Sequence, residues 1–132
     1  LPIYEIIRFH AGMDFTAPTG SEVYATGNGV IEAVTPAQRG LGKHIIIDHG
    51  FGYKSVYAHL DNFNVRKGQR VERGDIIGFV GNTGTSVAPH LHYEIKLNGK
   101  NVDPVNYYMN DLTPAEYEKM IEIVSKTGQS FD

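Results

Sequence analysis

Hydrophobic residues in the first hundred positions occur in short runs that are separated by turn-forming residues. Five runs are rich in β-branched or aromatic residues and are bounded by Gly, Asn or Asp, which is the pattern of strands joined by turns. They cover residues 29–34, 43–49, 53–60, 75–80 and 90–97. Helical patterns separate few of these runs, which argues against a parallel α/β fold. The pattern therefore predicts a mainly β domain with an antiparallel sheet or sandwich as its core.

The C-terminal segment follows a helical period instead. Thr113-Pro114-Ala115-Glu116 forms a capping box with proline at the first helical position. Apolar residues then recur at helical spacing, and a glycine offers a stop: Tyr117, Met120, Ile121, Val124 and Gly128. We expect one α-helix of about three to four turns, and a shorter helical turn that starts at Asp103-Pro104.

Length, hydrophobic content and net charge limit the classes of protein to which this chain can belong. A chain of 132 residues that is 41% hydrophobic is the size of one globular domain. It has no apolar run of the roughly 20 residues that a membrane span needs. The net charge of −3 and the absence of a basic stripe argue against binding of nucleic acid. The sequence begins at Leu1 without a signal peptide, so it reads as a segment of a longer chain. We expect this segment to be a monomeric domain.

The chain has no cysteine, so any bound metal must be held by His, Asp or Glu. His90 and His92 are two residues apart in a predicted strand, which places both imidazoles on one face. His10 and Asp14 form a second pair, and Gly12 between them allows the backbone to approach closely. Two histidines and one carboxylate would leave a fourth tetrahedral position open, as catalytic zinc requires.

The spacing of His10 and Asp14 is repeated by His44 and Asp48, and such spacings also arise by chance. Spacing alone therefore does not choose between the two pairs. A mild physical argument favours the first pair. His44 and Asp48 lie in a strongly β-forming run, where both can simply occupy the polar face of a strand.

The order of the motifs resembles the lysostaphin/LytM-type zinc metallopeptidases, which cleave peptides of peptidoglycan. The resemblance extends from about residue 8 to 108. It rests on the following segments: His10-Ala11-Gly12-Met13-Asp14, Gly29-Val30-Ile31, Ile45-Ile46-Ile47-Asp48-His49-Gly50, Val56-Tyr57-Ala58-His59-Leu60, Lys67-Gly68, Gly74-Asp75-Ile76-Ile77-Gly78, Gly81-Asn82-Thr83-Gly84, Pro89-His90-Leu91-His92-Tyr93-Glu94 and Asp103-Pro104.

The resemblance implies one Zn²⁺ per chain, with His10, Asp14 and His92 as its ligands. It implies that His59 and His90 are the catalytic residues, which act on the water and on the tetrahedral oxyanion. Glu94 shares strand parity with His92, and the resemblance favours a supporting role for it over that of catalytic base. The implied fold is an antiparallel sheet with a groove, like a duplicated hybrid motif.

Two departures from the family stand out. Ala88 occupies the position before Pro89 where the family usually has glycine, and the helix from Thr113 resembles only a subset of relatives. The expected organisation is a catalytic domain at residues 1–110 with a helical extension at residues 111–132. Neither departure removes a ligand, so we expect an active enzyme.

The implied function is hydrolysis of the peptide cross-links of bacterial peptidoglycan, in the periplasm or outside the cell. The resemblance of the predicted C-terminal helix to that of Gram-negative relatives favours a D-alanyl–diaminopimelate bond over a glycyl–glycine bond. Two alternatives belong to other classes. A non-catalytic relative that binds peptidoglycan would usually lack metal ligands. A lipoyl or biotinyl carrier would need a lysine in a different context from that of Lys67, and a phosphohistidine carrier would have no need of His10 or Asp14.

Overall fold

The computed structural model describes residues 6–9, 12–84 and 89–102. These residues form ten β-strands and contain no helix. The strands are β1 (Ile6–Phe9), β2 (Gly12–Thr16), β3 (Glu22–Tyr24), β4 (Gly29–Pro36), β5 (Lys43–Gly50), β6 (Tyr53–Phe63), β7 (Arg70–Val71), β8 (Ile76–Val80), β9 (His90–Leu97) and β10 (Lys100–Val102).

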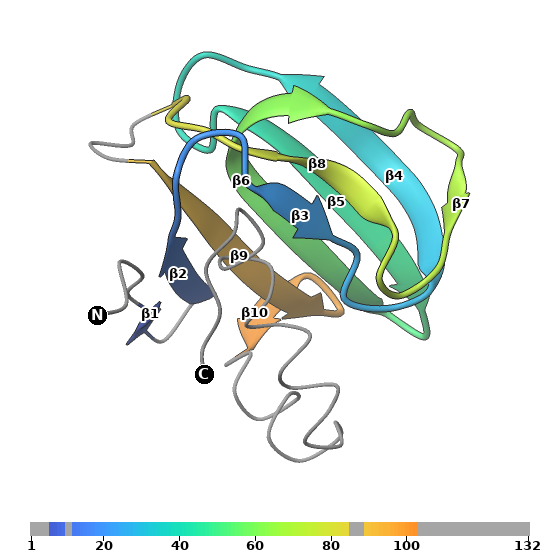
Figure 1. Cartoon of the computed structure of the whole chain (residues 1–132). Coiled ribbons are helices and arrows are strands. Elements are labelled where there is room, and N and C mark those ends of the chain that lie inside the picture. The colour runs from blue at the N-terminus through green and yellow to red at the C-terminus, as the bar shows by residue number, and fades with distance from the viewer. Residues whose placement is uncertain (1–5, 10–11, 85–88, 103–132) are drawn as a thin grey trace, which may run out of the picture.

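All strand pairs of the sheet are antiparallel. The main path runs β1-β2-β9-β6-β5-β4-β7, while β8 pairs with β6 and β3, and β10 pairs with β9. In Figure 1, β3 and β8 lie in front of β5 and β6, so the sheet folds over on itself. The central strands are therefore covered on one face.

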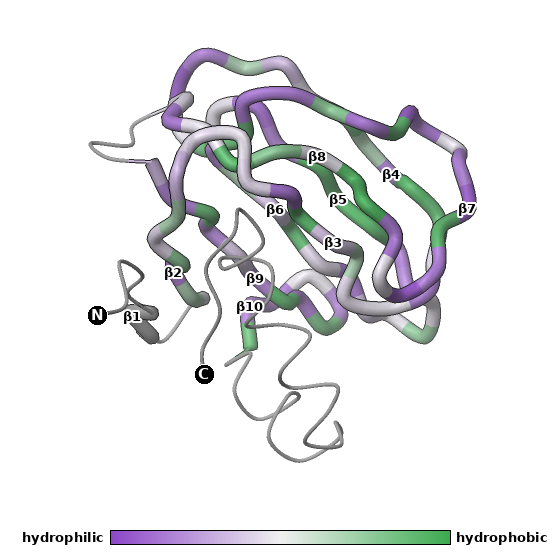
Figure 2. Tube along the Cα trace, viewed as in Figure 1, coloured by the Kyte–Doolittle hydropathy of each residue, from purple (hydrophilic) through white to green (hydrophobic). Residues whose placement is uncertain are grey.

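Alternation along the strands separates a core face from a second face. Ile45 and Ile47 of β5, Tyr57 of β6 and Tyr93 of β9 are almost fully buried and belong to one core cluster. Residues between them in the sequence point to the opposite face, because successive side chains of a strand alternate. Figure 2 shows hydrophobic residues concentrated along β5 and β8, with hydrophilic residues in many of the connections.

The predicted antiparallel β fold is confirmed, and each of the five predicted runs is a strand. The short strands β3, β7 and β10 have too few residues to show a period of two, so the pattern does not reveal them. The predicted helix at Thr113, the turn at Asp103 and the residue Ala88 lie outside the described residues. In the part of the chain described, no helix is long and apolar enough to cross a membrane.

A network of hydrogen-bonded polar side chains crosses the core. The Tyr57 hydroxyl lies 2.8 Å from the Thr26 hydroxyl and 2.9 Å from that of Ser55. Thr26 also contacts the Tyr93 hydroxyl at 2.7 Å, and Ser55 contacts Nε2 of His49 at 2.6 Å. Burial raises the pKa of both tyrosines, which therefore stay neutral. Because each hydroxyl has a partner, these polar groups are compatible with a buried position.

The buried position of His49 in this network predicts that the protein loses folding stability in acid. Burial lowers the pKa of His49, although the carbonyl of Asn28 at 2.8 Å partly offsets this effect. The unfolded chain therefore binds a proton more readily, and this part of the stability is lost as the pH falls below about 6.5. His49→Gln should flatten the acid decrease of the melting temperature, measured by calorimetry on metal-free protein. An unchanged pH dependence in the variant would contradict this role.

Candidate metal and catalytic site

Asp14 and His92 lie side by side because β2 pairs with β9. They are direct Cα partners in the register of the two strands. Directly paired residues project from the same face of a sheet, and Nδ1 of His92 lies 2.7 Å from Oδ1 of Asp14. An imidazole nitrogen and a carboxylate oxygen therefore meet on the face that is opposite to the core.

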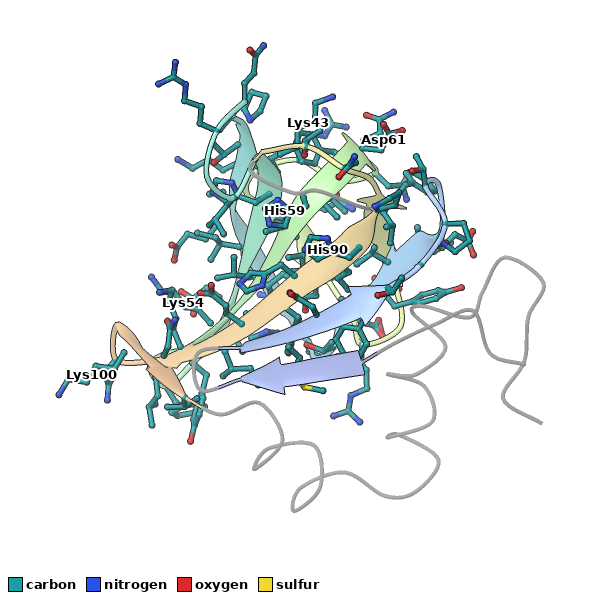
Figure 3. All side chains as sticks on the ribbon, turned by 90° about the vertical axis from the view of Figure 1, so that its left-hand side faces the viewer. Lys43, Lys54, His59, Asp61, His90 and Lys100 are labelled. Atoms are coloured by element: carbon teal, nitrogen blue, oxygen red, sulfur yellow. The ribbon has the colours of Figure 1, made fainter. Side chains whose placement is uncertain are left out.

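Two further imidazoles lie beside this pair. His90 is two residues from His92 on β9, and its Nε2 lies 3.8 Å from Oδ1 of Asp14. The ring of His59, from β6, has its centroid 4.8 Å from that of His90 and 5.9 Å from that of His92. Figure 3 shows His59 and His90 next to one another on adjacent strands. The structure thus brings together four of the five residues predicted for the site.

A β-bulge directs His59 toward this cluster. Lys43 pairs with Leu60 and Ile45 pairs with Tyr57, so two steps along β5 match three steps along β6. Tyr57 faces the core, and simple alternation would also turn residue 59 toward the core. The extra residue reverses that parity, since a bulge re-aims the side chain that it carries. His59 has φ of 63°, a left-handed conformation in which a non-glycine residue is uncommon.

The surroundings of His59 determine its tautomer. Its Nδ1 lies 2.7 Å from the backbone carbonyl oxygen of Thr83. A carbonyl only accepts hydrogen bonds, so Nδ1 carries the hydrogen and Nε2 is the nitrogen that can accept a proton. Burial lowers the pKa of His59 in spite of this hydrogen bond, and His90 and His92 lower it further. His59 is therefore neutral near pH 7, as a general base must be.

His92 is held from both sides by carboxylates. Its Nε2 lies 2.7 Å from Oε2 of Glu94, while Asp14 contacts Nδ1. Burial opposes the charged imidazolium, but the two carboxylates outweigh it and raise the pKa of His92 to about 9. The hydrogen bond to His92 in turn lowers the pKa of Glu94. A histidine that binds a metal usually donates its other N–H to a carboxylate, which is the relation of His92 to Glu94.

The donor set at this place fits a divalent metal in part. Asp14 and His92 supply one oxygen and one nitrogen, which are ligands that zinc accepts. Within residues 6–9, 12–84 and 89–102, no group of three His, Asp or Glu side chains is arranged to hold a metal. The third predicted ligand, His10, lies outside the described residues.

The competing pair, His44 and Asp48, is separated along β5. Four residues of extended strand place their Cα atoms about 13 Å apart, too far for both side chains to bind one ion. Nδ1 of His44 contacts the carbonyl oxygen of Gly42 at 2.8 Å. Oδ1 of Asp48 accepts the N–H of Gly50 at 2.9 Å. Both residues are thus engaged in the turns at the two ends of β5.

Gly12 allows β2 to pack against the site residues of β9. A Cβ atom at this position would lie 2.5 Å from the backbone oxygen of Tyr93, 3.2 Å from Cγ of Glu94 and 3.4 Å from Cε1 of His92. Gly12→Ala should therefore push the two strands apart. We expect a loss of about 1–3 kcal/mol in the free energy of unfolding and weaker binding of metal, measured by denaturant titration and by metal titration.

Gly99→Ala is the matched control for this substitution. Gly99 has φ of 83°, but a Cβ atom there would meet nothing within 4 Å. Its cost is conformational only, about 1–2 kcal/mol, and metal affinity should not change. Equal metal affinity in the two variants would contradict the proposed role of Gly12.

Thr83 is a residue of this site that the sequence patterns did not reveal. Its segment, Gly81-Asn82-Thr83-Gly84, was expected only as part of the resemblance. The contact with His59 is made by the backbone carbonyl of Thr83, and a backbone contact leaves no direct mark on the residue type. The contact also depends on chain segments 24 residues apart.

The sequence model of Peptidase family M23 matches residues 8–104. The DD-carboxypeptidase/endopeptidase Mpg of Neisseria meningitidis is 44% identical over 105 residues, which cover 80% of this chain and 24% of that protein. The peptidoglycan DD-endopeptidase ShyA of Vibrio cholerae is 35% identical over 125 residues, which cover 95% of this chain and 29% of that protein.

Solved structures show the same architecture. The catalytic domain of the antimicrobial peptidase lysostaphin from Staphylococcus simulans superposes with a TM-score of 0.70 at 35% sequence identity. The match covers 75% of this chain and 78% of the lysostaphin domain. The likeness therefore extends over most of that catalytic domain, whereas the chain spans only about a quarter of the length of the two curated relatives.

Proposed function

This chain belongs to peptidase family M23 and is a metallopeptidase domain, and on that premise we propose that it is a zinc-dependent endopeptidase that hydrolyses the peptide cross-links of bacterial peptidoglycan. The observation that carries the proposal is the convergence of Asp14, His59, His90 and His92 from three adjacent strands on one face of the sheet. Such a cluster of imidazoles around a carboxylate has the donors and bases that metal-assisted hydrolysis needs.

We propose that His10, Asp14 and His92 hold one zinc ion. Two of these residues are adjacent in the structure, and Glu94 engages the second ring nitrogen of His92 at 2.7 Å. Zinc in a site with three protein ligands supplies Lewis acidity, which polarises a scissile carbonyl and acidifies water. The proposed ligand set uses no cysteine, in agreement with the composition of the chain.

His59 and His90 are proposed to move protons and to stabilise charge in the reaction. With Nδ1 bound to the carbonyl of Thr83, His59 can take a proton only at Nε2. His90 lies beside it, with ring centroids 4.8 Å apart. In this proposal one imidazole removes a proton from water, and the other donates a hydrogen bond to the developing oxyanion.

The proposed substrate bond is the D-alanyl–diaminopimelate cross-link. Support comes from relatives named as DD-endopeptidases, which this chain resembles at 35% to 44% identity. The fold alone does not choose the bond, because one fold can carry sites of different specificity. We further propose that the chain acts in the cell envelope, in the periplasm or outside the cell, as a monomeric domain of a longer protein. In this proposal, residues 1–110 form the catalytic unit and residues 111–132 form its extension.

Digestion of two wall types tests this function. Purified protein with zinc is incubated with peptidoglycan cross-linked through diaminopimelate and, separately, with peptidoglycan cross-linked through glycine bridges. We expect cross-linked dimers of the first wall to be converted to monomers, identified by mass spectrometry, and we expect the reaction to stop with a chelator and resume with added zinc. Cleavage of glycine bridges alone would contradict the substrate, and activity in a chelator would contradict the metal.

A further inference from the structure

The bulge that carries His59 is held by groups from two loops. The N–H of His59 donates to the carbonyl of Leu41 at 2.8 Å, and its own carbonyl accepts the N–H of Gly81 at 3.1 Å. Its ring contacts Thr83 at 2.7 Å. A left-handed conformation of a non-glycine residue costs about 1–3 kcal/mol and persists only when its surroundings enforce it. The segments near Leu41 and Thr83 therefore determine where this imidazole lies.

The hydroxyl of Thr83 links these segments at the bulge itself. It donates to the carbonyl of Leu60 at 2.7 Å and accepts the N–H of Lys43 at 3.1 Å. Lys43 and Leu60 are the Cα partners on one side of the bulge in the β5–β6 pair. A single hydroxyl thus bridges both strands next to the extra residue. Figure 3 shows this neighbourhood through Lys43 and Asp61, which lie beyond His59 at one end of the strands.

Two glycines let Thr83 reach this position. A Cβ atom on Gly42 would lie 2.5 Å from the carbonyl carbon of Thr83 and 2.7 Å from its hydroxyl oxygen. A Cβ atom on Gly84 would lie 2.4 Å from the backbone oxygen of Gly40. The two loops are therefore packed backbone against backbone, and a side chain at either glycine would displace residue 83.

We propose that Thr83 is a positioning residue for His59. The side-chain hydroxyl of Thr83 anchors residue 83 to Lys43 and Leu60. The backbone carbonyl of Thr83 then fixes the Nδ1–H tautomer of His59 and directs Nε2 to the reacting groups. This inference rests on the proposed function only where it concerns catalysis. The anchoring of the ring and its tautomer are properties of the fold.

The test compares Thr83→Val with Thr83→Ser. Valine has nearly the shape of threonine but neither donates to Leu60 nor accepts from Lys43, whereas serine retains the hydroxyl. In the zinc-loaded protein, we expect Thr83→Val to lower kcat about 10- to 100-fold with zinc content unchanged, and to change KM by less than about twofold. Thr83→Ser should restore kcat to near the wild-type value. Thr35→Val, a half-buried threonine of β4, serves as a control that should keep wild-type activity.

Nitrogen-15 NMR of the histidine rings supplies a readout that does not depend on hydrolysis. The His59 signals are assigned by their loss in His59→Gln. We expect a protonated Nδ1 and an unprotonated Nε2 in the wild type and in Thr83→Ser, and a mixture of tautomers in Thr83→Val. A wild-type tautomer or wild-type kcat in Thr83→Val, or an equal loss in Thr83→Ser, would overturn the inference. If the wild type cleaves no peptidoglycan, the proposed function fails, and the NMR result alone still decides the role of Thr83.

Discussion

Replacing His92 with alanine is expected to remove both the metal and the activity of this protein. The proposed site has only three protein ligands, so each single loss leaves two ligands and an ion that exchanges readily with solvent. His10→Ala and Asp14→Ala should behave in the same way. We expect the zinc content of each variant, measured by elemental analysis after dialysis, to fall from about one ion per chain to a small fraction of that value.

The consequences for the fold differ between these variants. Asp14→Ala leaves the contact of His92 with Glu94 in place, whereas His92→Ala takes from Asp14 and Glu94 the imidazole that both carboxylates contact. The metal-free forms should therefore be compared by circular dichroism before metal loss is assigned to the ligand itself. A folded variant that lacks zinc identifies a ligand, and full zinc content in all three folded variants would exclude this ligand set.

The second pair with the same spacing provides the matched control. His44→Ala and Asp48→Ala remove a histidine and a carboxylate that are also four residues apart. Because β5 is extended between them, these side chains do not meet at one point. Both variants should keep about one zinc ion per chain. Loss of zinc in either one would assign the metal to His44 and Asp48 instead of to His10 and Asp14.

Periodicity in the sequence could predict two of the four described site residues, His90 and His92. His90 and His92 are two apart in a run with strand character, and the structure places both on the face that lies opposite the buried Leu91 and Tyr93. The same rule explains the main strands, whose apolar residues form the core. Local alternation is sufficient here because each of these strands pairs regularly over most of its length.

The position of His59 could not be predicted in this way. It follows the core residue Tyr57 by two positions, so alternation alone would turn it toward the aliphatic side chains of the core. The register shift against β5 reverses its direction, and that shift depends on the loops at Leu41 and Thr83. These contacts join residues that are distant in sequence. From the sequence, only the resemblance to known peptidases assigns His59 a role.

The pairing of Asp14 with His92 has a similar origin. Strand β2 is the neighbour of β9 although 78 residues separate the two side chains. No local pattern specifies which of the ten strands lies next to which. The resemblance therefore supplied the combination of residues, and the sheet topology supplies the physical reason for their contact.

Alanine substitutions of His59 and His90 are expected to separate catalysis from metal binding. Neither residue is a proposed ligand, so both variants should retain about one zinc ion per chain. They remove groups that act on protons and on developing charge, and we expect kcat to fall about 10²- to 10⁴-fold with a smaller change in KM. Zinc content and steady-state kinetics on a soluble cross-linked fragment measure the two effects on one preparation.

The pH dependence of these variants assigns their roles. Burial lowers the pKa of His59, so His59 is ready to accept a proton at neutral pH. If His59 is the base, the acid limb of the wild-type kcat/KM profile reports the protonation of His59. That limb should then be absent from the residual activity of His59→Ala and present in the profile of His90→Ala. An acid limb that persists in His59→Ala and disappears in His90→Ala would exchange the two roles. Abolition of turnover by Glu94→Gln, with zinc and fold intact, would instead assign the base to Glu94, whose carboxylate contacts His92 at 2.7 Å.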